Sequence, residues 1–256
     1  MILNPDPRGA DVVMNAITYG EEWSARWEQD IGPFRNPNTE NASRLLAEYA
    51  EGQPVLEFGV GTGRLALALQ DLGLKVSGID NSEWMIKELR KKPGGEGIKI
   101  TLGDFSTTKV NGSFGLVVLV SHAIMALNTQ DAQIACFENA FRHLVKGGYF
   151  AVEVLSPHRP GYGDGGLRAV RIEPDELMLH ASKLDPLTQQ VREIALFVRD
   201  GVAPRIRPAA SRFVCPGELD LMARIAGFRF RERWGGWDKK PFTSDSAIHV
   251  SIYQSH

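Results

Sequence analysis

Residues 55–64 of this 256-residue chain read VLEFGVGTGR, and this stretch decides the fold. An apolar run ends in three glycines at alternate positions, and the apolar segment 65–69 follows directly. Glycine is needed where a turn takes a positive φ, or where a ligand approaches the backbone without meeting a Cβ atom. The pattern predicts a buried strand, a tight turn and a helix, which form the nucleotide-binding corner of doubly wound α/β folds.

The spacing of the glycines separates the ligands that such a corner binds. A dinucleotide fingerprint, G-x-G-x-x-G, needs a glycine at position 64, where this chain has Arg64. The chain has instead E-x-G-x-G-x-G from Glu57, which resembles motif I of the class I S-adenosylmethionine-dependent methyltransferases. That ligand has no pyrophosphate but carries an ammonium group, which a nearby carboxylate can hold. The alternative is a glycine turn that merely closes a βα unit, because a lone glycine motif is a weak signal.

Two later acids fall in register with this motif. Asp80 ends the short apolar strand 75–80, where an acid accepts both hydroxyls of a ribose. This resembles motif II of the family, although it suits the ribose of NAD equally. The segment 103–105, Gly-Asp-Phe, resembles the next motif, in which an acid accepts from the adenine amino group and the following N–H donates to the ring. Met85 is placed to touch the adenine or to pack in the core.

The resemblance therefore implies S-adenosyl-L-methionine as the cofactor. The residues expected to contact it are Glu57, Gly59, Gly61, Gly63, Asp80, Asn81, Met85, Asp104, Phe105 and Ser121.

The remaining pattern predicts the fold class. A βα alternation continues to residue 155, with a continuous apolar run at 114–120 that is typical of a central parallel strand. A helix is expected at 131–145, with residues 146–148 as its C-cap, followed by a strand at 149–155. A helix from Pro216 to about residue 226 and strands at 228–234 and 247–253 complete the chain. We expect an α/β fold with a Rossmann-like, doubly wound sheet of seven strands, mostly parallel, with the last strand antiparallel as the resemblance implies.

Residues 167–213 alternate with the period of two that is typical of strands, and Asp200-Gly201 is a hairpin signal. We expect four regions: an N-terminal helical lid or cap (1–50), a cofactor-binding core (51–155), an antiparallel β insertion (156–213), and a C-terminal helix and strands that complete the core sheet (214–256). The insertion would serve as a substrate lid or as a subunit contact, and the latter would give a homodimer. Tyr19, Trp23 and Trp27 share one helical face, which is directed at the core or closes over the cofactor.

Composition excludes several other functions. A net charge of −2 argues against bulk nucleic-acid binding. The two cysteines have no metal-like spacing, so no metal is expected, and they predict a reducing compartment. We find no signal peptide and no apolar run long enough to span a bilayer, so we expect a cytoplasmic protein without membrane contact.

The resemblance implies methyl transfer from a sulfonium to a nucleophile, in which the protein chiefly supplies orientation. His122, after the buried strand, is the first candidate for a general base, and a structural histidine is the alternative. Tyr19 is expected to orient the acceptor or the donor, and His158 is a weaker candidate base. The chain lacks N-P-P-Y after the fourth strand, an acid-rich metal cluster and a paired-glutamate loop, so a small-molecule acceptor is left by elimination, perhaps from secondary metabolism. The sequence leaves N- and O-methylation open, as well as a non-catalytic S-adenosylmethionine-binding module and, less favoured, an NAD-dependent oxidoreductase.

Overall fold

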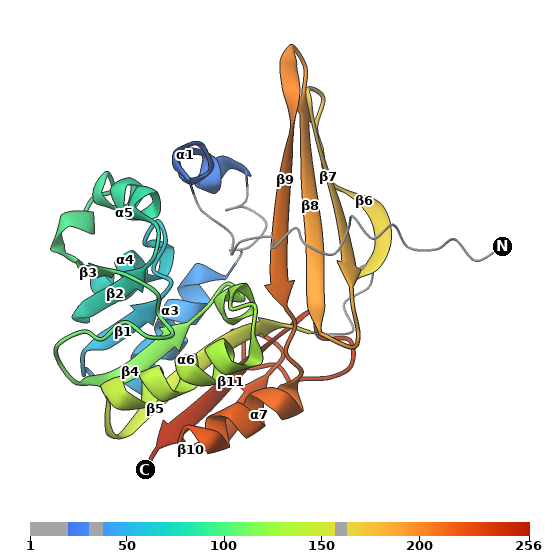
Figure 1. Ribbon diagram of the computed structural model, residues 1–256. Coiled ribbons are helices and arrows are strands. Elements are labelled where there is room, and N and C mark those ends of the chain that lie inside the picture. The colour runs from blue at the N-terminus through green and yellow to red at the C-terminus, as the bar shows by residue number, and fades with distance from the viewer. Residues whose placement is uncertain (1–19, 31–37, 157–162) are drawn as a thin grey trace.

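The computed structural model describes residues 20–30, 38–156 and 163–256, and its centre is a seven-stranded sheet (Figure 1). The strand order is β10-β11-β5-β4-β1-β2-β3. β1 to β5 are mutually parallel, whereas β11 runs antiparallel to both of its neighbours, β5 and β10. The strands are β1 (Val55–Phe58), β2 (Val76–Asp80), β3 (Lys99–Leu102), β4 (Phe114–Leu119), β5 (Leu144–Leu155), β10 (Phe228–Trp234) and β11 (Ile248–Ser255). The expected fold class is confirmed.

Helices cover both faces of this sheet because its central strands are apolar on both sides. Leu56 and Phe58 of β1 pack in one cluster with α6 (Gln130–His143) and α7 (Pro216–Ile225). Val55, whose side chain points to the opposite face of the sheet from that of Leu56, packs in a second cluster with α3 (Thr39–Ala50), α4 (Arg64–Asp71) and α5 (Glu83–Arg90). The alternation of the two clusters along one strand is what a parallel sheet buried on both faces requires. Two short 3₁₀ turns, η2 (Gly95–Gly97) and η3 (Ala123–Ala126), complete this part.

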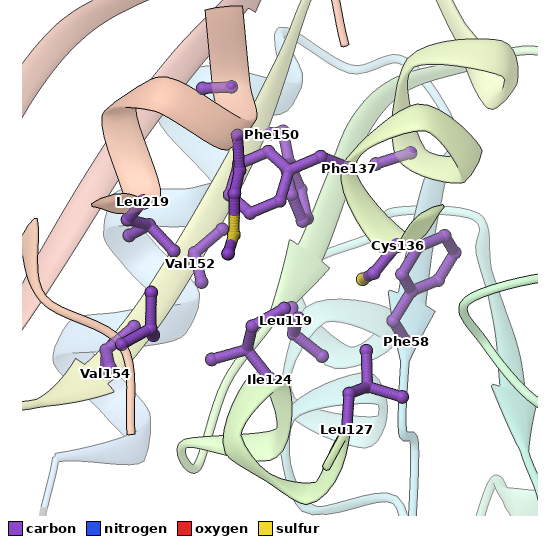
Figure 2. Packing of buried hydrophobic residues seen from close by; sticks show 14 of the residues in the cluster. Phe58, Leu119, Ile124, Leu127, Cys136, Phe137, Phe150, Val152, Val154 and Leu219 are labelled. Atoms are coloured by element: carbon purple, nitrogen blue, oxygen red, sulfur yellow. The ribbon is translucent and has the colours of Figure 1, made fainter. Parts of the chain in front are cut away.

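The cluster under α6 and α7 is built around aromatic rings (Figure 2). Phe137 of α6 meets Phe150 of β5 edge to face, with ring centroids 5.1 Å apart. Phe58, at the end of β1, meets Phe150 in the same way at 6.4 Å. These side chains are fully buried. Their packing fixes the end of β1, where the glycine turn begins.

The expected insertion forms a separate four-stranded antiparallel sheet in the order β6-β7-β8-β9. Its strands are β6 (Asp164–Ile172), β7 (Glu176–Leu184), β8 (Gln190–Arg199) and β9 (Val202–Arg212). In Figure 1 this sheet stands upright beside the core, and α1 (Glu21–Asp30) lies between β9 and α5. The expected hairpin is present, with Gly201 at a φ of +68° between β8 and β9. β9 contains Pro204 and Pro208, which it tolerates because it is an edge strand.

One boundary was wrong. The helix expected at 131–145 ends at His143, and residues 146–148 belong to β5 rather than to a helix cap. Leu144 is already extended and pairs with Phe114 of β4, and the register then shifts before Leu116 pairs with Tyr149. Gly147, at a φ of +83°, lies within this irregularity. Pairing with the neighbouring strand therefore ends the helix earlier than its local pattern suggests.

Among the described residues, no helix is long and apolar enough to cross a membrane.

Candidate active site

A cavity of about 1750 Å³ opens where the parallel strands end. Its walls come from the glycine turn, from the segments that follow β2, β3 and β4, from α1, and from the insertion sheet. Of the residues expected to contact the cofactor, these line it: Glu57, Gly59, Gly61, Asp80, Asn81, Met85, Asp104, Phe105 and Ser121. Gly63 does not. Ligands of open α/β sheets bind at this edge, outside the carboxyl ends of the strands.

The glycine turn uses its three glycines for different purposes. All three have positive φ, at +67° for Gly59, +54° for Gly61 and +80° for Gly63. A Cβ atom on Gly61 would meet only a carbonyl oxygen at 3.9 Å, so this position is open. A Cβ atom on Gly63 would lie 2.7 Å from the side chain of Leu89 in α5. Gly63 therefore leaves room for the Leu89 side chain beside the glycine turn.

Glu57 is a buried acid with one unsatisfied oxygen. Its side chain is almost fully buried, and Oε2 has no hydrogen-bond partner among the described residues. Burial raises the pKa of Glu57 to about 8; Asp80 adds to the rise, while Arg64 and the Ala66 N–H oppose it. An unpaired carboxylate oxygen beside a cavity fits a cationic ligand group, because an ammonium would supply the missing hydrogen bond.

Asp80 is held in place by two backbone donors. Its Oδ2 accepts from the Gly61 N–H at 2.7 Å, and its Oδ1 accepts from the Ser82 N–H at 2.8 Å. Ser82 also caps α5, as its hydroxyl oxygen accepts from the Met85 N–H at 3.2 Å. Each carboxylate oxygen keeps a further lone pair, so the fixed group can accept from two neighbouring hydroxyls.

The segment after β3 forms the next part of the wall. Asp104 Oδ1 accepts from both the N–H and the hydroxyl of Ser106, each at 2.7 Å. The ring of Phe105 stacks on Phe58 with centroids 6.0 Å apart. Met85, which is 3% exposed, also lines the cavity. An exposed acid beside a flat apolar ring and a thioether suits an adenine base, which needs stacking surface and an acceptor for its amino group.

Ser121 and His122 follow β4 in an unusual conformation. Both are non-glycine residues in the left-handed region, with φ of +55° and +60°. The Ser121 N–H donates to Oε2 of Glu153 at 3.0 Å, and Arg64 donates to the Ser121 hydroxyl at 3.1 Å. All four side chains line the cavity. Such backbone strain persists only where the surroundings hold it, and it clusters at functional sites.

Helix α1 connects the core to the insertion sheet. On the core side, Oε1 of Glu28 accepts from Thr62 of the glycine turn at 2.5 Å and from Lys92 at 2.6 Å. On the other side, Arg205 of β9 pairs with Glu22 at 3.2 Å and with Asp30 at 3.3 Å. Trp23 and Trp27 pack against Met178 and Phe197 of the insertion and also line the cavity. The third aromatic residue of this face, Tyr19, lies outside the described residues, and so does the weaker candidate base, His158.

Several cavity residues escaped the sequence analysis. Glu153 was detectable, because it is a single acid inside the apolar strand β5 and is 5% exposed. His180, Glu193 and Arg207 lie on the insertion strands and line the same cavity. Nothing in the sequence indicates which face of that sheet is turned inward. Among the described residues, no three histidine, cysteine or acidic side chains are grouped so that they could hold a metal ion.

Comparison with known proteins identifies the family. A family described as a methyltransferase domain matches residues 55–148. The structure of the CcbJ methyltransferase from Streptomyces caelestis is 33% identical, covers 94% of this chain and 99% of its own, and superposes with a TM-score of 0.88. The chain belongs to the S-adenosylmethionine-dependent methyltransferases. Cypemycin N-terminal methyltransferase from a Streptomyces species is 26% identical to this methyltransferase over 198 residues, which are 77% of this chain and 80% of the relative. CalS10 from Micromonospora echinaspora, an amino pentose methyltransferase solved with its cofactor, is 18% identical with a TM-score of 0.72 and coverages of 94% and 99%, and shares the fold.

S-adenosylmethionine is thus the cofactor, and the residues of the cavity fit it. The unpaired oxygen of Glu57 suits the ammonium, the fixed carboxylate of Asp80 suits the ribose, and Asp104 with Phe105 suits the adenine. When bound, the cofactor supplies a methyl group already activated by the sulfonium charge.

Proposed function

We propose that this methyltransferase transfers the methyl group to the amino nitrogen of a small molecule, an intermediate of secondary metabolism. The observation that carries the proposal is one continuous cavity with two chemically distinct walls. One wall holds the cofactor-binding set, and the other combines His122 and Glu153 with the inner face of the insertion sheet. The relatives support an amine, since one is named as an N-terminal methyltransferase and another as an amino pentose methyltransferase of calicheamicin biosynthesis.

We propose that the cofactor contacts come from Glu57, Gly59, Gly61, Gly63, Asp80, Asn81, Met85, Asp104, Phe105 and Ser121, of which all but Gly63 line the cavity. The lid function proposed for the N-terminal region is supported by α1, which is tied to the glycine turn through Thr62 and to β9 through Arg205. The insertion sheet forms the opposite side of the substrate enclosure.

In the proposed mechanism, the neutral amine attacks the methyl carbon with its lone pair, and the bond between that carbon and sulfur breaks. The product ammonium then loses a proton. The His122 imidazole lines the cavity, where it is placed to accept a proton from the acceptor nitrogen. Glu153 holds the Ser121 N–H and so fixes the backbone that carries His122, while its charge favours a cationic acceptor group. Positioning supplies most of the rate enhancement, because the methyl donor is already activated.

A labelling screen tests this proposal. The protein is incubated with S-adenosylmethionine carrying a tritiated methyl group and with pairs of acceptors that differ only in an amino or a hydroxyl group, such as amino sugars and their parent sugars. The proposal predicts label on the amino member of at least one pair, with one equivalent of S-adenosylhomocysteine formed. The Asp80→Ala variant, which disturbs donor binding, is the control for enzyme-dependent transfer. Label on the hydroxyl members alone, or on none, would contradict the proposal.

A further inference from the structure

The inner face of the insertion sheet carries an arginine in an unusual position. Arg207 of β9 is half-buried and lines the cavity, and across the strand pair it faces Ala195 of β8. Two residues further along β9, on the same face, Ala209 pairs with Glu193 of β8. The two alanines leave the wall shallow around Arg207, and the space there belongs to the cavity.

Four other arginines of this sheet are matched by acids. Arg171 and Arg199 both bind Glu176, Arg205 binds Glu22 and Asp30, and Arg212 binds Glu218. Within the part of the chain that the structure describes, Arg207 has neither a hydrogen bond nor an ion pair. A guanidinium carries five N–H donors in a planar fork, and at this half-buried position facing the cavity they are available to a ligand.

Two aromatic rings lie against the guanidinium of Arg207. Its Cζ lies 3.7 Å from the centroid of the Trp23 ring and 5.7 Å from that of Phe197. Stacking of this kind occupies the face of the guanidinium and leaves the N–H groups at its edge free to bind. Burial, together with the neighbouring Arg205, lowers the pKa of Arg207, while Asp30 and Glu22 oppose the shift. A ligand anion would oppose this shift and favour the charged guanidinium.

We propose that Arg207 binds a carboxylate of the methyl acceptor, so that the acceptor is a small amino carboxylate. The inference rests on the proposed function, which supplies the amine. A planar fork matches the two oxygens of a carboxylate. The neighbouring cation Arg205 is already paired with Glu22 and Asp30, so Arg207 favours the one negative charge of a carboxylate over the two of a phosphate monoester. Arg207 of the insertion sheet then binds the carboxylate of the acceptor, and the nitrogen of the acceptor points to the Ser121–His122 side of the cavity.

Binding measurements test this inference separately from turnover. Protein saturated with S-adenosylhomocysteine is titrated by calorimetry with α- to ω-amino acids, each paired with its own primary amide. The inference predicts that the carboxylates bind wild-type protein about 10- to 100-fold more tightly than the matched amides, as expected for a charge-assisted pair. Arg207→Gln should abolish that preference. Arg192→Gln, which removes an exposed arginine from β8 of the same sheet, should preserve it.

Two further measurements make the outcome unambiguous. Arg207→Lys keeps the charge without the planar fork, so it should retain only part of the preference, and it replaces Arg207→Gln if that variant fails to fold. The affinity for S-adenosylmethionine should be the same in Arg207→Gln as in wild type; a tenfold loss would mean that Arg207 binds the carboxylate of the cofactor, and would overturn the inference. A preference that survives in Arg207→Gln, or the lack of any preference in wild type, would also overturn it. Preferential binding without methyl transfer would support the inference while refuting the proposed amine methylation.

Discussion

Among single residues, Glu57 sets the response of the cofactor site to pH. Burial raises its folded-state pKa from 4.5 to about 8. Between these two values the folded protein binds a proton that the unfolded chain has already released. The contribution of Glu57 to stability is therefore fullest near pH 4.5 and is lost as the pH rises to 8.

We predict that Glu57→Gln, which is neutral at every pH, becomes progressively more stable relative to wild type between pH 5 and 8. The difference in unfolding free energy should grow by a few kcal/mol, since each pKa unit corresponds to about 1.4 kcal/mol. Urea unfolding at several pH values measures it, with the exposed Glu40→Gln as the matched control. A difference that does not change with pH would show that Glu57 is ionised in the folded protein throughout.

Asp80 is fixed by two backbone N–H groups, so its removal both strands these donors and deletes the proposed ribose contact. Asp80→Ala should weaken binding of S-adenosylmethionine by about 1–3 kcal/mol, measured by calorimetry. Asp71→Ala, at the exposed end of α4, removes the same charge away from the cavity and should leave the affinity unchanged. Equal affinity in both variants would mean that the ribose binds elsewhere.

His122 needs a variant that respects its backbone. At a φ of +60° an alanine adds strain of about 1 kcal/mol, whereas asparagine tolerates the left-handed region better. If His122 is the base, His122→Asn should lower kcat roughly 10²- to 10⁴-fold and leave cofactor affinity intact. Turnover that is unchanged from pH 6 to 9 would remove His122 from the mechanism and leave positioning alone.

Among secondary-structure elements, α1 couples the cofactor site to the substrate wall. Glu28 holds it to Thr62 and Lys92, and Asp30 and Glu22 hold it to Arg205. We propose that α1 closes over the cofactor, and closing elements of this kind control the entry and release of ligands. The helix was predicted from its aromatic spacing, but its contacts join residues more than 30 positions apart in the chain, which local pattern cannot anticipate.

We predict that Glu28→Ala speeds the release of S-adenosylmethionine several-fold with little loss of global stability, because the pair with Lys92 is partly exposed. Stopped-flow displacement of bound S-adenosylhomocysteine measures the rate. Glu40→Ala, in an exposed ion pair of α3, is the control. If release is equally fast in wild type, α1 does not close over the cofactor.

At the scale of the whole molecule, the sequence predicts the parts that depend on local pattern. Strand period, the hairpin at Asp200-Gly201 and the register of Glu57, Asp80 and Asp104 all follow from residues close together in the chain. The early end of α6 at His143 does not, because Leu144 pairs with the distant Phe114. The proposed acceptor wall could not be predicted either, because the local pattern does not show that the insertion sheet turns the face with Arg207 to the cavity.

The central claim is that one cavity holds the methyl donor beside a small-molecule amine. A single-turnover chase tests it most directly: protein preloaded with S-adenosylmethionine carrying a deuterated methyl group is mixed with the amine panel, and all species are identified by mass spectrometry. The account predicts that the label leaves the donor, appears on the nitrogen of an amine, and is matched by one equivalent of S-adenosylhomocysteine. Label that stays on intact donor in the presence of every amine would contradict it.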